Sequence, residues 1–240
     1  MVESIAWRPF SPRHARSVHD TKFMNEAMVA TSDFDVTEHY ELGRIAVRSS
    51  VDPISLQAKG QRKQRFQEAL GAAVGAATRG VFLHDVEIAL VRYVEASRRY
   101  QTHIVADLDN ILKPILDAIT GPDRVLIDDN QVQSIKASWM TPGRETGFEL
   151  TASCLMEGNG DYAPRDGISF VEFGVDRCYV LFPPIQGSMV EGYRRLVVAY
   201  QEMLDAGIAE EVARQMLPVA RPFPRARLGR FTIRHHTDYP

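Results

Sequence analysis

Hydrophobic positions change their spacing several times along this chain of 240 residues, and each spacing predicts a type of element. Apolar and polar residues alternate, or form short apolar runs bounded by turn residues, in four segments that we predict to be strands. These segments are residues 40–47, 86–91, 131–139 and 147–156. Residues 58–78 have helix-compatible spacing after the turn residues SSVDPISLQ, and a shorter helical pattern covers residues 115–119. Helices interleaved with strands predict an α/β or α+β domain over residues 40–156.

The segments on either side of this domain have different patterns. Residues 1–39 mix Pro, Ser, His and acidic residues without a sustained period, which predicts a loosely ordered N-terminal arm. Gly, Asn, Asp and Pro gather in residues 157–167, as in a linker. Residues 168–240 contain a strand-like run, helical stretches at 189–206 and 208–217, and a basic tail. We interpret them as a mainly helical C-terminal extension whose amphipathic helices pack on the main domain or on a second copy.

Composition narrows the classes of protein to consider. The net charge of −3 provides no general attraction to nucleic acid, so any such contact must come from local basic patches. No run approaches the roughly 20 apolar residues of a membrane helix, and the first residues lack the apolar core of a secretory signal, so we expect a cytoplasmic protein without a membrane partner. Cys154 and Cys178 lie in apolar runs without zinc-ligand spacing, and we predict buried thiols.

Carboxylates are concentrated in the sequence ADLDNILKPILDAITGPDRVLIDDNQV. Asp107 and Asp109 flank a single residue, and if residues 104–108 are extended, both point to the same face. Asp128 and Asp129 follow the next apolar run. If the chain folds back, these carboxylates converge on one site of the kind that Mg²⁺ prefers, with Mn²⁺ as an alternative.

A lysine accompanies the acidic residues. Lys113 lies four residues after Asp109, which on a helical turn places the two side chains on the same side. Pro114 restricts the helix before it, so we expect residues 110–113 to be irregular or to form a first helical turn. The helical spacing of the apolar residues leaves Lys113 and Asp117 off the buried stripe. The apolar residues concerned are Ile111, Leu112, Ile115, Leu116 and Ile119.

Each acidic pair taken alone also suits a turn or a helix cap, where Asp accepts backbone hydrogen bonds. The combination favours a functional site. It concentrates charge among apolar residues, where a core is expected and unpaired charge is costly.

These residues resemble those of a known family. DLDNILKPILDAITG followed by LIDDNQVQSIKASW is similar to the RusA-type crossover junction endodeoxyribonucleases, which have the same Asp-x-Asp-Asn, Lys, Asp-Ala and Asp-Asp order. Weaker similarity extends upstream, so the resemblance covers about residues 44–155. It implies a mixed β-sheet with packed helices, in a homodimeric nuclease that uses Mg²⁺ to resolve four-way (Holliday) DNA junctions by paired phosphodiester cleavage. Such enzymes act in DNA recombination and repair.

The resemblance also implies roles for individual residues. Asp107, Asp109 and Asp129 match the essential carboxylates, and Lys113 matches their basic partner. Asp128 joins the three aspartates as an expected metal ligand for one or two ions, Asn110 and Asp117 complete the motif, and no organic cofactor is expected. The residues that we expect to contact DNA are Arg62, Lys63, Arg98, Arg99, Lys113, Arg225, Arg227 and Arg230. The basic tail equally suits a solvated terminus or a partner-docking segment.

Other functions remain open at this point. A phosphatase of the haloacid dehalogenase type also uses Asp-x-Asp, Lys and a later Asp-Asp, but its last acidic pair lies much further downstream. A non-catalytic protein that binds branched DNA or a partner would keep the fold for recognition alone. A related nuclease repurposed for other branched or foreign DNA would use the C-terminal extension to select its substrate.

Overall fold

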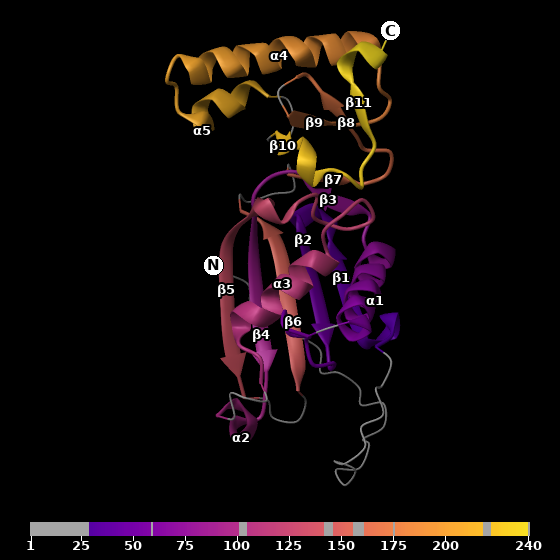
Figure 1. The fold of residues 1–240 in the computed structure, drawn as a ribbon, viewed down its shortest axis with the longest axis vertical. Helices are drawn as coiled ribbons and strands as arrows, with labels where there is room; N and C mark the ends of the chain where they lie inside the picture. The colour runs from indigo at the N-terminus through magenta and orange to yellow at the C-terminus, as the bar shows by residue number, and fades with distance from the viewer. Residues whose placement is uncertain are drawn as a thin grey trace.

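The computed structural model describes residues 29–58, 60–100, 105–141, 146–155, 161–174, 176–217 and 222–239. The fold is of the mixed α+β class, as the sequence predicts. Figure 1 shows a larger part built on a five-stranded sheet and, at one end of it, a smaller part formed by the C-terminal residues.

The larger sheet has the strand order β1-β2-β6-β4-β5. Its strands are β1 (Phe34–His39), β2 (Arg44–Ser49), β4 (Val86–Tyr93), β5 (Val132–Met140) and β6 (Gly147–Cys154). Only β4 and β5 run parallel, whereas the other neighbours in this sheet are antiparallel. The last three strands match the predicted ones closely; in β4 and β6 the alternating pattern reflects burial of one face, whereas β5 is an edge strand without a fully buried residue.

The first strand lies where the sequence analysis placed a loosely ordered arm. Residues 34–39 form β1 and pair with β2 from Phe34 opposite Ser49 to His39 opposite Arg44. Phe34 is buried and its ring lies 5.7 Å from that of Phe66. The predicted arm is therefore wrong for residues 34–39, whose order comes from this pairing and packing. Residues 1–28 lie outside the described part of the chain.

Two helices cover one face of the larger sheet, α1 (Gln61–Ala77) and α3 (Leu108–Ala118). The helix α1 buries Phe66, Leu70, Ala73 and Val74 at helical spacing against the alternate residues of the strands. The strand residues in this core include Ile45, Val47, Ile88, Leu90, Phe148 and Leu150. Since α1 lies within the predicted 58–78, the sequence located this helix correctly.

The helix α3 differs from its prediction. It begins at Leu108, before Pro114, whereas the sequence predicts a regular helix only from residue 115. Proline has no N–H for the carbonyl four residues earlier, and that carbonyl, of Asn110, instead accepts a hydrogen bond of 2.6 Å from the backbone N–H of Leu56. Asp107 is consequently the N-cap and Asp109 lies in the first turn, not on one face of a strand as expected.

The C-terminal extension contains more strand than the sequence indicated. Besides α4 (Gly187–Asp205) and α5 (Glu210–Ala213), it has a four-stranded sheet of order β10-β9-β8-β11. These strands are β8 (Ser169–Glu172), β9 (Arg177–Leu181), β10 (Phe223–Pro224) and β11 (Ile233–His235). Within the predicted linker, β7 (Tyr162–Pro164) pairs with β3 (Gly80–Phe82), so residues 162–164 are part of the fold and the linker prediction is wrong for them.

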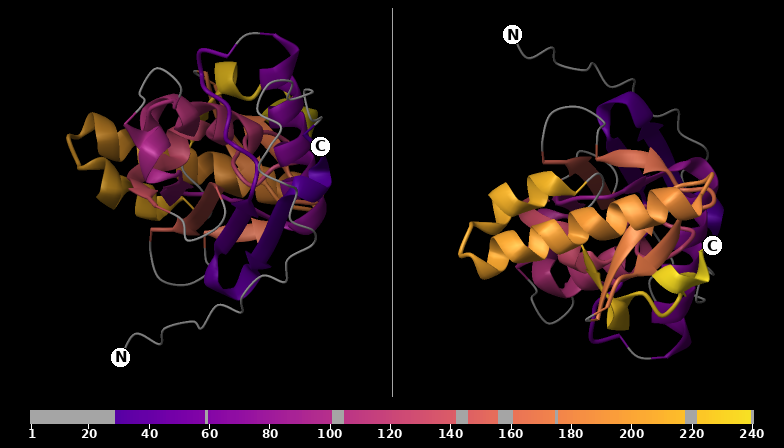
Figure 2. Two further views of the ribbon diagram at one scale, coloured as in Figure 1. Left: turned by 90° about the horizontal axis from the view of Figure 1, so that it is seen from below. Right: turned by 90° about the horizontal axis from the view of Figure 1, so that it is seen from above.

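The smaller sheet is covered on both faces. Tyr179 and Leu181 of β9 face α4, whereas Cys178 and Val180 belong to a separate core, as expected for side chains that alternate along a strand. This second core includes Ile127 and Leu228, so it joins the extension to the larger part of the molecule. Figure 2 shows α4 as the outermost layer when the molecule is viewed from the extension. The loop that leads into the acidic pair is therefore packed against the extension.

Both cysteines are free thiols; Cys178 is buried, as predicted, and Cys154 is half-buried. None of the helices in the described ranges combines the length and the apolar content needed to cross a bilayer.

Candidate active site

One face of α3 carries the charged residues of the motif. Asp109, Lys113 and Asp117 are spaced four residues apart and share this face, while Ile111 and Ile115 are buried on the other. The Lys113 ammonium lies 2.7 Å from Asp117 Oδ1 and also donates a hydrogen bond to Asp129 Oδ2. The helix thus brings its lysine to the acidic pair that follows in the sequence.

The acidic pair is held in place by a buried glutamine that the sequence analysis did not single out. The Nε2 atom of Gln131 donates to the carbonyls of Phe82 at 2.7 Å and His84 at 3.1 Å. Its Oε1 atom accepts from the backbone N–H groups of Ile127 at 2.8 Å and Asp128 at 3.0 Å. Every polar atom of this side chain is used, and the turn at residues 127–129 is tied to the end of β3.

The pKa values of the two carboxylates are shifted in opposite directions. Asp128 is only 4% exposed; burial raises its pKa, the neighbouring Asp129 raises it further, and Arg227 acts in the opposite direction. Burial also raises the pKa of Asp129, but Lys113, Asp128 and Arg227 together lower it below its ordinary value. The Oδ2 atom of Asp128 is buried and receives no hydrogen bond from any described residue.

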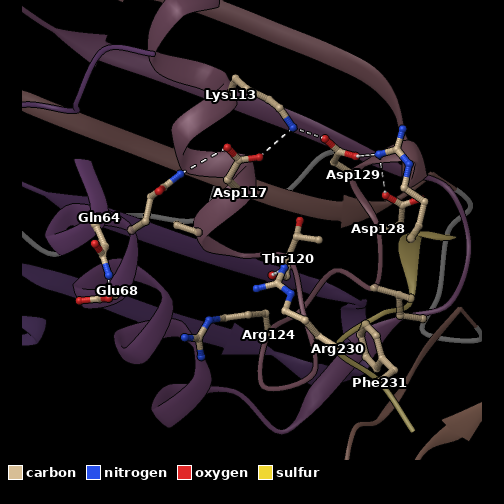
Figure 3. Close-up of a pocket in the computed structure, with 14 residues that line it drawn as sticks. Gln64, Glu68, Lys113, Asp117, Thr120, Arg124, Asp128, Asp129, Arg230 and Phe231 are labelled. Carbon is tan, nitrogen blue, oxygen red and sulfur yellow. Dashed lines mark hydrogen bonds and ion pairs between the residues drawn. The ribbon is translucent and has the colours of Figure 1, made fainter. Parts of the chain in front are cut away.

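The C-terminal extension contributes two arginines to the same place. Arg227 Nη1 lies 3.1 Å from Asp129 Oδ1 and 3.4 Å from Asp128 Oδ1 (Figure 3). Arg230 Nη2 donates a 3.1 Å hydrogen bond to the carbonyl of Thr120. Leu228, between these arginines, is fully buried in the core shared with Ile127. The arginines are therefore positioned by packing between segments about a hundred residues apart in the chain.

These groups surround a pocket of about 460 Å³. Its lining combines cations, carboxylates and amides from α1, α3, the acidic turn and the extension (Figure 3). The lining residues are Gln64, Gln67, Glu68, Lys113, Asp117, Ala118, Thr120, Arg124, Ile127, Asp128, Asp129, Arg227, Arg230 and Phe231. A polar pocket with cations beside carboxylates suits a phosphate-containing ligand together with a divalent cation.

The predicted metal ligands are only partly brought together. Asp128 and Asp129 line the pocket, whereas Asp107 and Asp109 are exposed at the start of α3 and do not line it. Among the described residues, no three His, Cys, Asp or Glu side chains lie close enough together to hold a metal ion. The Asp128 oxygen without a hydrogen-bond donor nevertheless fits a divalent cation, because a buried carboxylate oxygen needs a positive partner.

The basic residues predicted to contact DNA are divided between several places. Lys113, Arg227 and Arg230 line the pocket. Arg225 instead forms an ion pair with Glu172 of the extension, and Arg62 and Lys63 lie on the first turn of α1. Arg98 and Arg99 belong to α2 (Ala96–Arg99), at the end of the larger sheet away from the extension (Figure 1). Arg98 also lies 3.5 Å from Asp52.

Comparison with known proteins shows which family the part of the chain that carries this site resembles. Residues 54–151 match a protein family described as endodeoxyribonuclease RusA, and they span α1, α3, the acidic pair, β4, β5 and part of β6. This part of the chain is therefore similar to the RusA endodeoxyribonuclease family, which confirms the resemblance recognised in the sequence. The comparison with curated proteins found no match.

Proposed function

We propose that the chain is a divalent-metal-dependent endodeoxyribonuclease that cuts four-way DNA junctions by paired phosphodiester cleavage. One observation carries the proposal. Within the segment that matches the RusA family, Lys113 and the pair Asp128 and Asp129 meet at the wall of a polar pocket. A hydrolytic site for DNA needs carboxylates for a metal and a cation for phosphate charge, and both are present here.

Asp128 and Asp129 would hold Mg²⁺ or Mn²⁺ together with Asp107 and Asp109 from the start of α3. Asp109 suits this role because it shares a helix face with Lys113, which already contacts Asp129. When bound, the metal supplies charge neutralisation at the scissile phosphate and lowers the pKa of water.

Lys113 supplies the fixed positive charge of the site. Burial lowers its pKa, but hydrogen bonds to Asp117 and Asp129 outweigh burial and raise it, so the side chain stays protonated at neutral pH. Asp117 also accepts a 3.3 Å hydrogen bond from Gln67 of α1, which restrains the carboxylate that orients the lysine. Lys113 is thereby held where it can stabilise negative charge that develops on a phosphate oxygen.

The DNA backbone would contact basic residues around the pocket. Arg227 and Arg230 line the pocket from the extension, and Arg62 and Lys63 on α1 would extend this surface. A homodimer would present two such sites to opposite arms of a junction and so permit paired nicks.

A second candidate is a related nuclease with a different branched-DNA substrate. The observation in its favour is that the extension, which lies outside the matched residues 54–151, supplies Arg227 and Arg230 to the pocket wall. Residues that line the pocket from an additional layer can alter which DNA structures fit.

Cleavage of labelled DNA tests the proposal. The substrates are a four-way junction, a fork and a matched duplex, each incubated with Mg²⁺ or EDTA. Wild type should make paired nicks in the junction only with Mg²⁺, whereas Asp129→Asn and Asp109→Asn should bind the junction without cutting it. Asp166→Asn, at an exposed position outside the pocket, is the matched control and should cut normally. Cleavage of forks as well would favour the second candidate. Undiminished cleavage by Asp129→Asn would refute the assigned site.

A further inference from the structure

Two arginines in the pocket lie apart from the acidic pair. Arg124 comes from the turn that follows α3, and Arg230 comes from the C-terminal extension. In Figure 3 both lie on the side of Thr120 that faces away from Lys113. The two parts of the molecule therefore each bring one guanidinium to this side of the pocket.

Neither guanidinium forms an ion pair with a carboxylate in the described part of the chain. Arg124 Nη1 donates to the carbonyl of Asp123 at 3.0 Å, and Arg230 Nη2 donates to the carbonyl of Thr120 at 3.1 Å. Burial lowers the pKa of Arg124; Asp123 opposes this, and the charges of Arg165 and Arg230 lower it further. Arg124 is half-buried, and the exposed Arg230 brings a second like charge close to it, which is unfavourable unless an anion lies between or beside them.

The other two cations of the pocket, Lys113 and Arg227, do contact carboxylates. Lys113 contacts Asp117 and Asp129, and Arg227 contacts Asp128 and Asp129. Those two cations are already neutralised in the free protein. Arg124 and Arg230 form no such ion pair among the described residues, so their charge can attract an anionic ligand.

Two glycines in α1, Gly71 and Gly75, leave space for the Arg124 side chain. A Cβ atom at Gly71 would lie 2.5 Å from Arg124 Nε, and one at Gly75 would lie 3.0 Å from Arg124 Nη1 and 2.6 Å from the carbonyl of Asp123. A glycine inside a helix is less favourable than alanine. Larger residues at these positions would displace the arginine and the turn that carries it.

Arg230 is positioned by the core of the extension. It follows the fully buried Leu228, and the ring of the next residue, Phe231, lies 5.1 Å from that of Phe170 in an edge-to-face arrangement. Its guanidinium lies close to Gly121, where a Cβ atom would approach it to 3.3 Å. Both arginines are thus set in place before any ligand binds.

We propose that Arg124 and Arg230 form a binding site for a phosphodiester group of the DNA strand that passes through the pocket, next to the phosphate at the acidic pair. This inference rests on the proposed function and assigns the extension a direct part in holding the substrate. Guanidinium groups suit this ligand because their N–H donors match phosphate oxygens in paired hydrogen bonds. Holding a neighbouring phosphate would fix the register of the strand at the acidic pair.

Metal-free DNA binding tests the inference without any cleavage. Fluorescence anisotropy in EDTA, over a salt series, compares wild type with Arg124→Gln, Arg230→Gln and the double variant on a labelled four-way junction and a matched duplex. Each single variant should bind both DNAs about fivefold to tenfold more weakly, with a slope of log affinity against log salt that is shallower by about 1. Because both arginines hold one phosphate, the double variant should have nearly the same slope as either single variant. Arg195→Gln, on the exposed side of α4, should match wild type.

Thermal unfolding and a lysine variant test whether weaker DNA binding is caused only by loss of folded protein. Arg124→Gln should not lower the melting temperature, since it removes one of two repelling charges; if Arg230→Gln unfolds, Arg230→Lys keeps the charge and should lose only part of the affinity. Unchanged affinity and slope in both single variants would overturn the inference. It would also be overturned if DNA binding were unchanged while inorganic phosphate stabilised wild type but not Arg124→Gln, because the site would then hold a free anion. Either result leaves metal-dependent cleavage by wild type intact, whereas failure of the proposed function would appear as absence of that cleavage.

Discussion

Replacing Arg227 by glutamine should strengthen metal binding by the DNA-free protein. Arg227 lies 3.1 Å from Asp129 and 3.4 Å from Asp128, the two carboxylates that we propose as metal ligands at the pocket wall. A divalent cation that binds there must displace this guanidinium or tolerate its repulsion. Arg227→Gln removes the competing charge and keeps a polar side chain of moderate length.

The magnitude follows from the distances and the exposure. Unit charges about 4 Å apart interact by about 1 kcal/mol in water and about 4 kcal/mol at an effective dielectric constant of 20. The Arg227 side chain is 51% exposed, so solvent screening favours the lower value. About 1 kcal/mol corresponds to an increase of about fivefold in metal affinity. The metal-free variant should be less stable by a similar amount, about 1 kcal/mol, because the buried Asp128 loses a cation.

Titration with Mn²⁺, followed by its electron paramagnetic resonance signal at low salt, measures the affinity, and urea unfolding in EDTA measures the stability. Arg225→Gln is the matched control: its side chain is also 51% exposed in the same segment, but it pairs with Glu172 outside the pocket. That variant should bind Mn²⁺ as wild type does. If Arg227→Gln bound Mn²⁺ with unchanged or weaker affinity, competition between the arginine and the metal at this carboxylate pair would be disproved.

Three further predictions, two on substitutions and one on a buried thiol, test the fold around the site. Gln131→Ala should lower the free energy of unfolding by roughly 3 kcal/mol in urea titrations, because it leaves buried partners such as the Asp128 N–H unsatisfied; a loss below 1 kcal/mol would contradict this role. Leu70 is a buried residue of α1. Leu70→Ala should lower the free energy of unfolding by about 3 kcal/mol but leave the Mn²⁺ affinity of the folded protein unchanged. Burial raises the pKa of the Cys178 thiol to about 11, so at pH 8 its thiolate fraction falls from about one tenth to about one thousandth. Alkylation of Cys178, located by mass spectrometry, should therefore be slow in the folded protein and accelerate with rising pH; rapid labelling at pH 8 would show that the thiol is accessible.

Much of the site was predictable because its signal is local. The spacing of Asp109, Lys113 and Asp117 along one helix, and the adjacent Asp128 and Asp129, are properties of short stretches of sequence. The same holds for α1, β4 and β6, whose periods of hydrophobic residues report which face is buried. The amino-acid sequence by itself thus determined the main elements of the larger part and the residue types of the candidate site.

Other features depend on partners far away in the chain. The strand β1 and the short strands of the extension have too few residues for a clear period, and their order comes from pairing with distant strands. Gln131 acts by reaching carbonyls 47 and 49 residues earlier, and Arg227 meets Asp128 across 99 positions. Only the tertiary structure decided that the extension would close one wall of the pocket, because that contact arises from a core shared by Ile127 and Leu228, which no local pattern reveals.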